Sequence, residues 1–400
     1  MMLVYPNYDK CILNVVSSVR QYYRTPVEYK TLPYLDKELE KRYKNVVMII
    51  LDGMGADVVT RTLPRDSFLR KNMSQKITTV YPSTTVSAMT SYYTGVSPNE
   101  HAWLGWSLFF KEFCRCIDVF KNCDSFTKQP MTQPNIGGFV MPYENIFKDI
   151  AVSKRMAVQP FTVMPRGISF PETGNIHKQA DSFEDICSLV KKICATDQNT
   201  FTFAYWDDPD DVIHKFGVAA QETKNVMNVI NSCIEELCDT LTDTLFIISA
   251  DHGMIDIDEE VFINEIPELD RCLIMPPSME GRAAAFFVKT DMSEEFCWQF
   301  NRLLGKDFKL MSAEEFLSKE ILGSGRTHPK TADFIGDFIA CGIGKKAIRY
   351  RTLNSRPKPR QAAAHAGLTD EEMTVPLICV GTEITAGNEA KADYLDMILG

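Results

Sequence analysis

The sequence has too few cysteines for a disulfide scaffold, only six histidines, and no excess of positive charge. Twelve cysteines among 400 residues are far fewer than a disulfide scaffold needs, and no two of them have CxxC spacing. Reduced thiols are typical of the cytoplasm, so we expect a cytoplasmic location. The formal net charge of −10 excludes a surface built to coat polymeric nucleic acid, which requires clustered Lys and Arg.

Long hydrophobic segments are also lacking. The N-terminus reaches Asp9 and Lys10 before any apolar run of signal-peptide length, so no export signal is expected. The longest uncharged stretch, residues 77–99, has 23 residues, of which ten are Ser or Thr and two are Pro. Such a segment would not be stable in hydrocarbon, and the sequence therefore predicts no membrane span.

Short β-branched runs alternate with longer helical segments along most of the chain. This alternation predicts an α/β fold, a three-layer α/β/α sandwich with a mostly parallel central sheet. The clearest strands are expected at residues 46–51, 200–206, 244–250 and 375–380. Open sheets of this kind bind ligands beyond the carboxyl ends of their strands, so polar residues that follow these runs are the candidates for function.

The pattern changes after residue 254, where a strand–helix–strand–helix series is expected. Its elements are predicted at residues 283–288, 293–304, 308–311 and 313–321. We interpret residues 255–358 as an inserted small α+β cap subdomain. Residues 1–254 and 359–400 would then form a metal-binding catalytic core.

Two segments place acidic or hydroxyl side chains where phosphate chemistry needs them. Asp52 directly follows a buried strand, although a solvated Asp-Gly turn is the alternative. Thr84 and Thr85 follow Pro82 at an expected helix start, where a hydroxyl either caps the helix or acts as a nucleophile. A helix N-terminus favours a phosphate because its backbone N–H groups are free and its dipole is positive.

Three further segments carry histidine. Asp210 and His214 are spaced i, i+4, so one helical face would present a carboxylate and an imidazole to a metal. Asp251 and His252 come directly after a strand, and His365 precedes the last strand in a run of small residues. The alternatives are a helix-capping acidic cluster, a turn with an incidental histidine, and a core histidine.

Taken together, these segments indicate a particular kind of active site more specifically than any one of them does alone. The chain has only six histidines, and three of them lie in these motifs. Two groups of oxygen and imidazole ligands, with a hydroxyl at a helix start, are what a two-metal phosphoryl-transfer site needs. The metals neutralise the phosphoryl oxygens, and one of them activates the nucleophile.

The order of the motifs resembles the alkaline phosphatase superfamily, and within it the type I phosphodiesterase/nucleotide pyrophosphatase family. That family has a strand ending in Asp-Gly, a Pro-x-x-Thr, a Pro-Asp-x-x-x-His, an Asp-His-Gly and a late His-Gly. Here they read LDG at 51–53, PSTT at 82–85, PDDVIH at 209–214, DHG at 251–253 and HAG at 365–367. The resemblance implies an alkaline phosphatase-like fold.

The resemblance also implies a site that holds two Zn²⁺ ions, with Mn²⁺ as an alternative. One zinc would be bound by Asp210, His214 and His365, and the other by Asp52, Asp251 and His252. The resemblance selects Thr85 over Thr84 as the nucleophile that forms a phosphothreonine intermediate. The backbone N–H of Val86 would contact the phosphoryl oxygens.

The predicted substrate is a small phosphate ester or nucleotide-type molecule, hydrolysed as a diester or pyrophosphate. The family carries a phosphate-binding asparagine where this chain has Trp106. Trp106 and Tyr205, with neighbouring aromatic residues, are expected to form a wall for the second substituent of a diester. Arg166 or Arg282 near the phosphate would instead favour a monoester. The alternatives are a phosphomonoesterase, a phosphonate hydrolase, a phosphomutase, and a metal- or nucleotide-binding relative without turnover.

Overall fold

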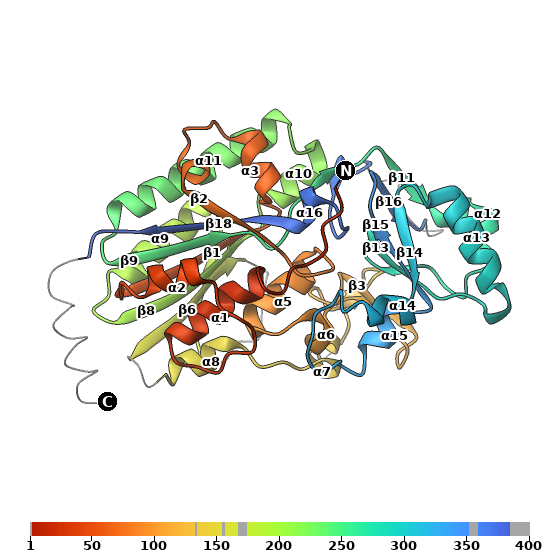
Figure 1. Cartoon of the computed structure of the whole chain (residues 1–400), viewed down its shortest axis with the longest axis horizontal. Helices are drawn as coiled ribbons and strands as arrows, with labels where there is room; N and C mark the ends of the chain where they lie inside the picture. Colours follow the sequence, from red (N-terminus) through yellow and green to blue (C-terminus); the bar gives the residue numbers. More distant parts are fainter. Residues whose placement is uncertain (1, 133, 154–156, 167–173, 352–358, 385–400) are drawn as a thin grey trace.

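The computed structural model describes residues 2–132, 134–153, 157–166, 174–351 and 359–384, and its centre is a seven-stranded sheet (Figure 1). From one edge to the other, the strands are β2 (Met73–Thr78), β18 (Thr374–Gly381), β9 (Thr244–Ser249), β1 (Asn45–Leu51), β8 (Asn199–Trp206), β6 (Val158–Pro165) and β7 (Ile176–Ala180). The five strands from β9 to β7 are parallel. Only β18 runs antiparallel to its neighbours, so the sheet is mostly parallel.

Strand β1 shows why this sheet is central. All seven residues of its NVVMIIL sequence are buried, as expected of a strand covered on both faces. Its residues pair in register with β8 on one side and β9 on the other, so that Val46 lies between Phe201 and Leu245. The carboxyl ends of these three strands consequently lie side by side.

Helices cover both faces of the sheet. One layer contains α1 (Ile12–Tyr22), α2 (Pro33–Leu39), α5 (Thr85–Thr94) and α8 (Ile146–Ala151), and Figure 1 shows α1, α5 and α8 below the sheet. The opposite layer contains α3 (Ala56–Thr62), α4 (Phe68–Asn72), α9 (Phe183–Cys194), α10 (Asp210–Phe216) and α11 (Gln221–Thr240). The main hydrophobic core fills the space between the sheet and these layers. The predicted three-layer α/β/α sandwich is confirmed.

A second sheet, seven-stranded and antiparallel, forms the inserted α+β cap at the right of Figure 1. Its strands are, in order, β14 (Phe308–Ser312), β15 (Phe338–Gly342), β13 (Ala283–Phe286), β12 (Ser278–Met279), β3 (Ser107–Phe110), β4 (Arg115–Asp118) and β5 (Cys123–Asp124). The helices of this region are α12 (Pro267–Asp270), α13 (Ser293–Leu304), α14 (Ala313–Ser318) and α15 (Thr331–Ile335). Strands β3–β5 precede residue 255, so this sheet draws on more of the chain than residues 255–358.

The remaining elements are short and connect the two sheets. They are α6 (Pro98–His101), α7 (Ile136–Val140), the pair β10 (Ile255–Asp256) and β17 (Ala363–Ala364), the pair β11 (Glu259–Phe262) and β16 (Lys346–Arg349), α16 (Asp370–Met373), and two 3₁₀ turns, Ile263–Glu265 and Thr290–Met292. The division of the chain at residues 254 and 359 stays a prediction. Residues 352–358 and 385–400, which bear on it, lie outside the described residues.

Two expectations about the environment of the chain can be compared with the structure. Within the described ranges, no helix combines the length and apolar character that crossing a bilayer requires. All twelve cysteines lie in described segments, and each is a free thiol. The cytoplasmic location stays a prediction.

Candidate active site

The acidic motif residues lie at the carboxyl edge of the main sheet. Asp52 follows β1 directly, and Asp251 follows β9 after a single residue. Asp210 is the first residue of α10, in the segment that follows β8. Because β1 lies between β8 and β9 and all three run parallel, these segments leave the sheet next to one another.

The structure brings these carboxylates together with histidine in two groups. Ligand atoms of Asp52, Asp251 and His252 lie within 4.8 Å of one another, and so do those of Asp210, His252 and His365. His252 Nε2 is 3.2 Å from Asp52 Oδ1 and 3.4 Å from Asp251 Oδ2. His252 therefore joins both groups.

His214, predicted to complete the second ligand set, lies beside it. Its Nε2 is 3.3 Å from Asp210 Oδ2, and its ring centre is 5.2 Å from that of His365. All six residues predicted to bind metal thus lie in one cluster. Their division into two sets of three stays a prediction.

The three histidines of the cluster are oriented alike by backbone carbonyls. His214 Nδ1 lies 2.8 Å from the Ala363 oxygen, His252 Nδ1 lies 3.1 Å from the Gly253 oxygen, and His365 Nδ1 lies 3.1 Å from the Ser83 oxygen. A carbonyl only accepts hydrogen bonds, so each Nδ1 carries the proton and donates. This fixes the tautomer that leaves Nε2 free as a metal ligand.

The electrostatics of this cluster favour a bound cation. Burial, and then the charge of Asp52, raises the pKa of Asp251 well above its ordinary value. Burial disfavours a charged His252, but Asp251 and Asp52 outweigh it and raise the pKa of His252 to about 10. Burial also opposes ionisation of Asp52, yet the hydrogen bond and charge of His252 hold its pKa below the ordinary value. Two buried carboxylates here compete for one positive charge.

Two buried carboxylate oxygens of the cluster indicate that a metal ion would fit between the ligands. Asp210 Oδ1 and Asp251 Oδ2 have no hydrogen-bond partner among the residues that the structure describes. An unpaired buried carboxylate oxygen is costly, and a cation between the ligands would satisfy both oxygens. Carboxylate oxygens combined with imidazole nitrogens suit zinc, and also manganese. The residues present therefore fit a divalent metal.

Thr85 faces this cluster from the first position of α5. Its Oγ1 lies 3.3 Å from Asp52 Oδ2 and 3.3 Å from His252 Nε2. Thr84, the N-cap residue, makes no side-chain capping hydrogen bond, and its hydroxyl donates instead to Glu280 Oε1 at 2.8 Å. Val86 is the second residue of the helix, so its backbone N–H belongs to the first turn, which has no partner within the helix.

The aromatic residues predicted to contact substrate have different surroundings. Tyr205 is only 2% exposed, and its hydroxyl donates a short hydrogen bond to Asp52 Oδ2. The ring of Trp106 is partly exposed, packs on Phe120 with centres 6.3 Å apart, and has Lys121 Nζ 5.3 Å from its centre. The substrate contacts of Tyr205 and Trp106 stay predictions.

The two arginines considered as phosphate ligands are already engaged. Arg282 is fully buried and pairs with Glu372, with N–O distances of 2.6 and 2.7 Å. Arg166 pairs with Asp181 through Nε at 2.7 Å on the exposed surface. Neither guanidinium is free to serve as a second charge on a phosphate.

Glu280 is a residue of the site that no motif indicated. It lies in the turn between β12 and β13, and its Oε1 accepts from the Trp106 backbone N–H at 2.7 Å as well as from Thr84. The only sequence signal is an acidic residue between Met279 and Gly281 in an otherwise apolar and small-residue strand pair. That signal says nothing about which distant segment the side chain contacts.

Comparison with known structures supports this fold. The chain aligns with murine ectonucleotide pyrophosphatase/phosphodiesterase 5 at a TM-score of 0.61 and 16% identity, covering 88% of this chain and 95% of that one. It aligns with phosphonoacetate hydrolase from Sinorhizobium meliloti 1021, in complex with phosphonoformate, at a TM-score of 0.61 and 15% identity, covering 88% and 94%. An inactive threonine-to-alanine variant of the murine protein, in complex with AMP, aligns at a TM-score of 0.59 and 16% identity, covering 88% of this chain and 93% of that one.

Sequence comparison gives a complementary result. No curated protein matches the chain. The profile of the type I phosphodiesterase/nucleotide pyrophosphatase family, however, matches residues 46–120 and 142–314. Those ranges contain five of the six predicted metal ligands and Thr85. A match over more than half of its length shows that this chain belongs to the type I phosphodiesterase/nucleotide pyrophosphatase family, whose members are metal-dependent phosphoester hydrolases.

Proposed function

We propose that the protein is a two-zinc phosphodiesterase or nucleotide pyrophosphatase in which Thr85 is the nucleophile. The observation that carries this proposal is the position of Thr85 Oγ1, 3.3 Å from both Asp52 and His252 at the start of α5. A hydroxyl at a helix N-terminus beside a carboxylate–imidazole cluster is placed to attack phosphorus.

The metal ligands follow from the family pattern. Asp210, His214 and His365 would hold one zinc, and Asp52, Asp251 and His252 the other. Bound zinc would supply positive charge for the phosphoryl oxygens and lower the pKa of the nucleophilic hydroxyl. Support comes from the two buried carboxylate oxygens that have no hydrogen bond among the described residues, and from the three Nδ1–carbonyl contacts that orient the histidines.

The chain's own groups account for the covalent steps. Thr85 Oγ1 gives its proton to solvent water and forms a bond to phosphorus. The P–O bond to the leaving group breaks on the opposite side, and the departing oxygen takes up a proton from water when it leaves as an alcohol. Water then attacks the phosphothreonine, and the P–Oγ1 bond breaks with return of a proton to Thr85. The backbone N–H of Val86, at the positive end of α5, would donate to a non-bridging oxygen throughout.

A diester or pyrophosphate is the favoured substrate because the site lacks spare positive charge. A monoester dianion carries one more negative charge than a diester, and the guanidinium of Arg282 is committed to Glu372. The partly exposed ring of Trp106 offers a flat face for a base or aromatic leaving group. The AMP complex of the murine relative supports a nucleotide-type substrate.

Phosphonate hydrolysis is the second candidate, since the fold is equally similar to that of phosphonoacetate hydrolase. The two candidates differ in the bond that breaks, P–O or P–C. Assays with bis(nitrophenyl) phosphate and with phosphonoacetate, each with zinc supplied, separate them.

The proposal is tested by Thr85→Ala. Loss of the nucleophilic oxygen should lower diesterase kcat by about a thousandfold or more. Zinc content, measured by elemental analysis, should stay at two ions per chain, because no predicted ligand is altered. Thr84→Ala is the matched control, since its hydroxyl faces Glu280, and it should retain most of the turnover. The proposal would be contradicted if Thr84→Ala abolished diesterase activity while Thr85→Ala kept it. It would also be contradicted if the wild type bound one zinc ion or none.

A further inference from the structure

The turn between β12 and β13 inserts an acidic side chain next to the nucleophile. Glu280 Oε1 accepts hydrogen bonds from the Thr84 hydroxyl at 2.8 Å and from the Trp106 backbone N–H at 2.7 Å. Thr84 directly precedes Thr85, the proposed nucleophile, and Glu280 also holds the backbone at Trp106. A cap residue therefore places a carboxyl group next to the segment that carries the proposed nucleophile.

We infer that Glu280 is a specificity-determining residue, which makes the site select monoanionic phosphodiesters over dianionic phosphomonoesters. This inference rests on the proposed function. A carboxylate beside the nucleophile repels each charge on the phosphoryl group, and a monoester dianion has one charge more than a diester.

Two hydrogen bonds fix the position of the Glu280 carboxyl group. Two N–H or O–H donors converge on one oxygen, which stabilises the negative form. Burial raises the pKa of Glu280 above its ordinary value, and these two hydrogen bonds and the charge of Arg349 offset only part of that rise, so the carboxylate form is the one present above this raised pKa. In its ionised form, Glu280 therefore adds a negative charge beside the segment that carries Thr85.

Neighbouring cations do not offset this charge for the substrate. Arg349 donates through Nε to Glu260 at 3.0 Å and also contacts Gln361. Arg282, two residues from Glu280, donates from Nε and Nη2 to Glu372 and from Nη1 to the Lys346 carbonyl. The third oxygen of a monoester would therefore meet a carboxylate without a free guanidinium beside it.

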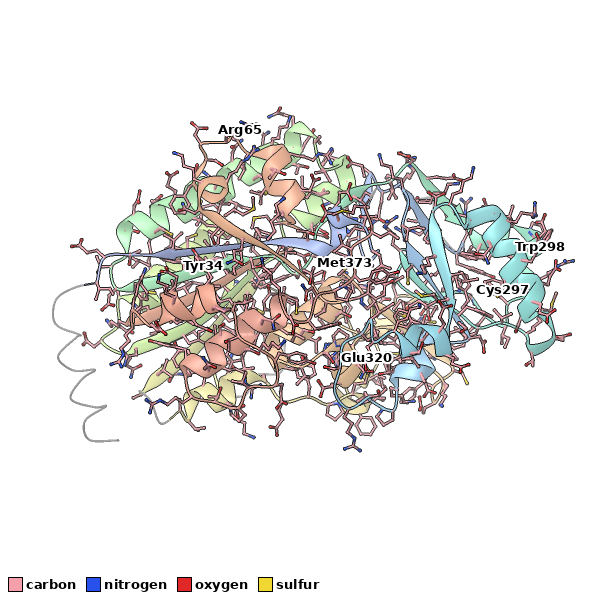
Figure 2. All side chains as sticks on the ribbon, viewed as in Figure 1. Tyr34, Arg65, Cys297, Trp298, Glu320 and Met373 are labelled. Carbon is pink, nitrogen blue, oxygen red and sulfur yellow. The ribbon has the colours of Figure 1, made fainter. Side chains whose placement is uncertain are left out.

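The test is Glu280→Gln, which keeps an oxygen to accept from Thr84 and Trp106 but removes the charge. We expect kcat/KM for nitrophenyl phosphate to rise about tenfold relative to bis(nitrophenyl) phosphate, or about 1.4 kcal/mol in transition-state binding. Glu295→Gln is the matched control. It removes one negative charge from α13, whose Trp298 projects from the outer end of the cap (Figure 2), and should leave the ratio unchanged. An unchanged ratio in Glu280→Gln would overturn the inference.

A binding measurement separates this inference from the proposed function. Inorganic phosphate at pH 8 is a dianion, so calorimetry on the zinc-loaded Thr85→Ala protein needs no turnover. Adding Glu280→Gln to that variant should tighten phosphate binding about tenfold. Equal or weaker binding would refute the role of Glu280, even in a protein that hydrolyses diesters. If the wild type hydrolyses neither ester, but Glu280→Gln still tightens phosphate binding tenfold in the Thr85→Ala background, only the proposed function is refuted.

Discussion

At the scale of single residues, the hydroxyl of Tyr205 determines how Asp52 is held. Tyr205 is buried and donates to Asp52 Oδ2, while Asp52 Oδ1 lies toward His252. Tyr205→Phe removes only this hydrogen bond and keeps the packed ring. A group that orients a metal ligand typically contributes 10- to 100-fold in affinity, so zinc binding should weaken by about tenfold or more. Competition with a chromophoric chelator measures the change.

Tyr350→Phe is the matched control for this prediction. Tyr350 also donates its hydroxyl to an aspartate, Asp270, at 3.3 Å, but within the cap. This variant should bind zinc as the wild type does. Equal zinc affinity of the Tyr205 variant and the control would show that Asp52 is held without Tyr205.

His101 should make the stability of the protein depend on pH. Burial lowers the pKa of His101 from its ordinary 6.5 to about 3. Its Nδ1 accepts from the Trp103 backbone N–H at 3.0 Å, and its Nε2 lies 3.1 Å from Ser91 Oγ, so the ring is held neutral. As pH falls below 6.5, the unfolded chain takes up a proton that the folded chain refuses.

The resulting loss of stability can be measured with urea. The contribution of His101 is absent above pH 6.5 and grows as the pH falls toward 3, so at pH 5 it should cost about 2 kcal/mol of unfolding free energy. His101→Asn keeps a side-chain oxygen that can accept from Trp103 and has no titration in this range. Its unfolding free energy should change less between pH 7 and pH 5 than that of the wild type. Parallel pH profiles would exclude His101 as the cause.

The residues of the candidate site divide into those that a motif marks and those that it does not. The LDG, PSTT, PDDVIH, DHG and HAG segments could be found in the sequence because each follows or precedes a recognisable strand or helix. Their roles as ligands and nucleophile stay predictions. Glu280 could not be found, since its contacts to Thr84 and Trp106 cross 196 and 174 residues and depend on the cap docking onto α5.

At the scale of elements, local sequence pattern was sufficient where its periodicity is clear, as in the fully buried strand β1 and the amphipathic helix α13. The strand at 46–51 and the helix at 293–304 were predicted close to β1 and α13. The pattern could not show that β18 runs antiparallel to β9, because a strand buried on both faces looks the same in either direction. Nor could it show that β3 pairs with β12, since pairing between distant segments leaves no periodic signal.

Gly95 ends the helix that carries the nucleophile, and its backbone explains why glycine is needed there. Its φ of 74° is left-handed, and a Cβ would lie 3.0 Å from Arg20 Nη1 and 3.3 Å from Val16 Cγ1. Gly95→Ala should therefore lower the unfolding free energy by about 1–2 kcal/mol. Because Thr85 is at the opposite end of α5, zinc content at 25 °C should not change.

Urea unfolding of Gly95→Ala is compared with that of Gly138→Ala. Gly138 lies in α7 with an ordinary backbone, and the nearest atom to a Cβ there is 3.4 Å away. That control should be neutral or slightly stabilising, since alanine favours helix over glycine. An equal loss in both variants would mean that the left-handed conformation at Gly95 is not what costs stability.

At the scale of the whole molecule, one buried ion pair joins the cap to the core behind the active site. Arg282 lies in the β12–β13 turn and also donates to the Lys346 carbonyl at 2.7 Å. Its partner Glu372 lies in α16, next to β18 of the main sheet, and accepts from the Gly367 backbone N–H at 2.7 Å. The loop that carries His365 is therefore fixed by the same carboxylate that anchors the cap.

Removing the cation from this pair should destabilise the molecule strongly. Arg282→Met would leave Glu372 buried with its hydrogen-bond donors but without its positive partner, at a cost of about 3–5 kcal/mol in unfolding free energy. Arg271→Met breaks the exposed pair with Glu295, at 2.8 Å, and should cost less than about 1 kcal/mol. Urea unfolding with probes in the cap and in the core measures both variants. Since Arg282 also binds the cap to the loop of His365, its loss should weaken zinc binding in protein that is still folded. A small stability loss with normal zinc affinity would show that packing between the two sheets, and not this ion pair, couples the cap to the active site.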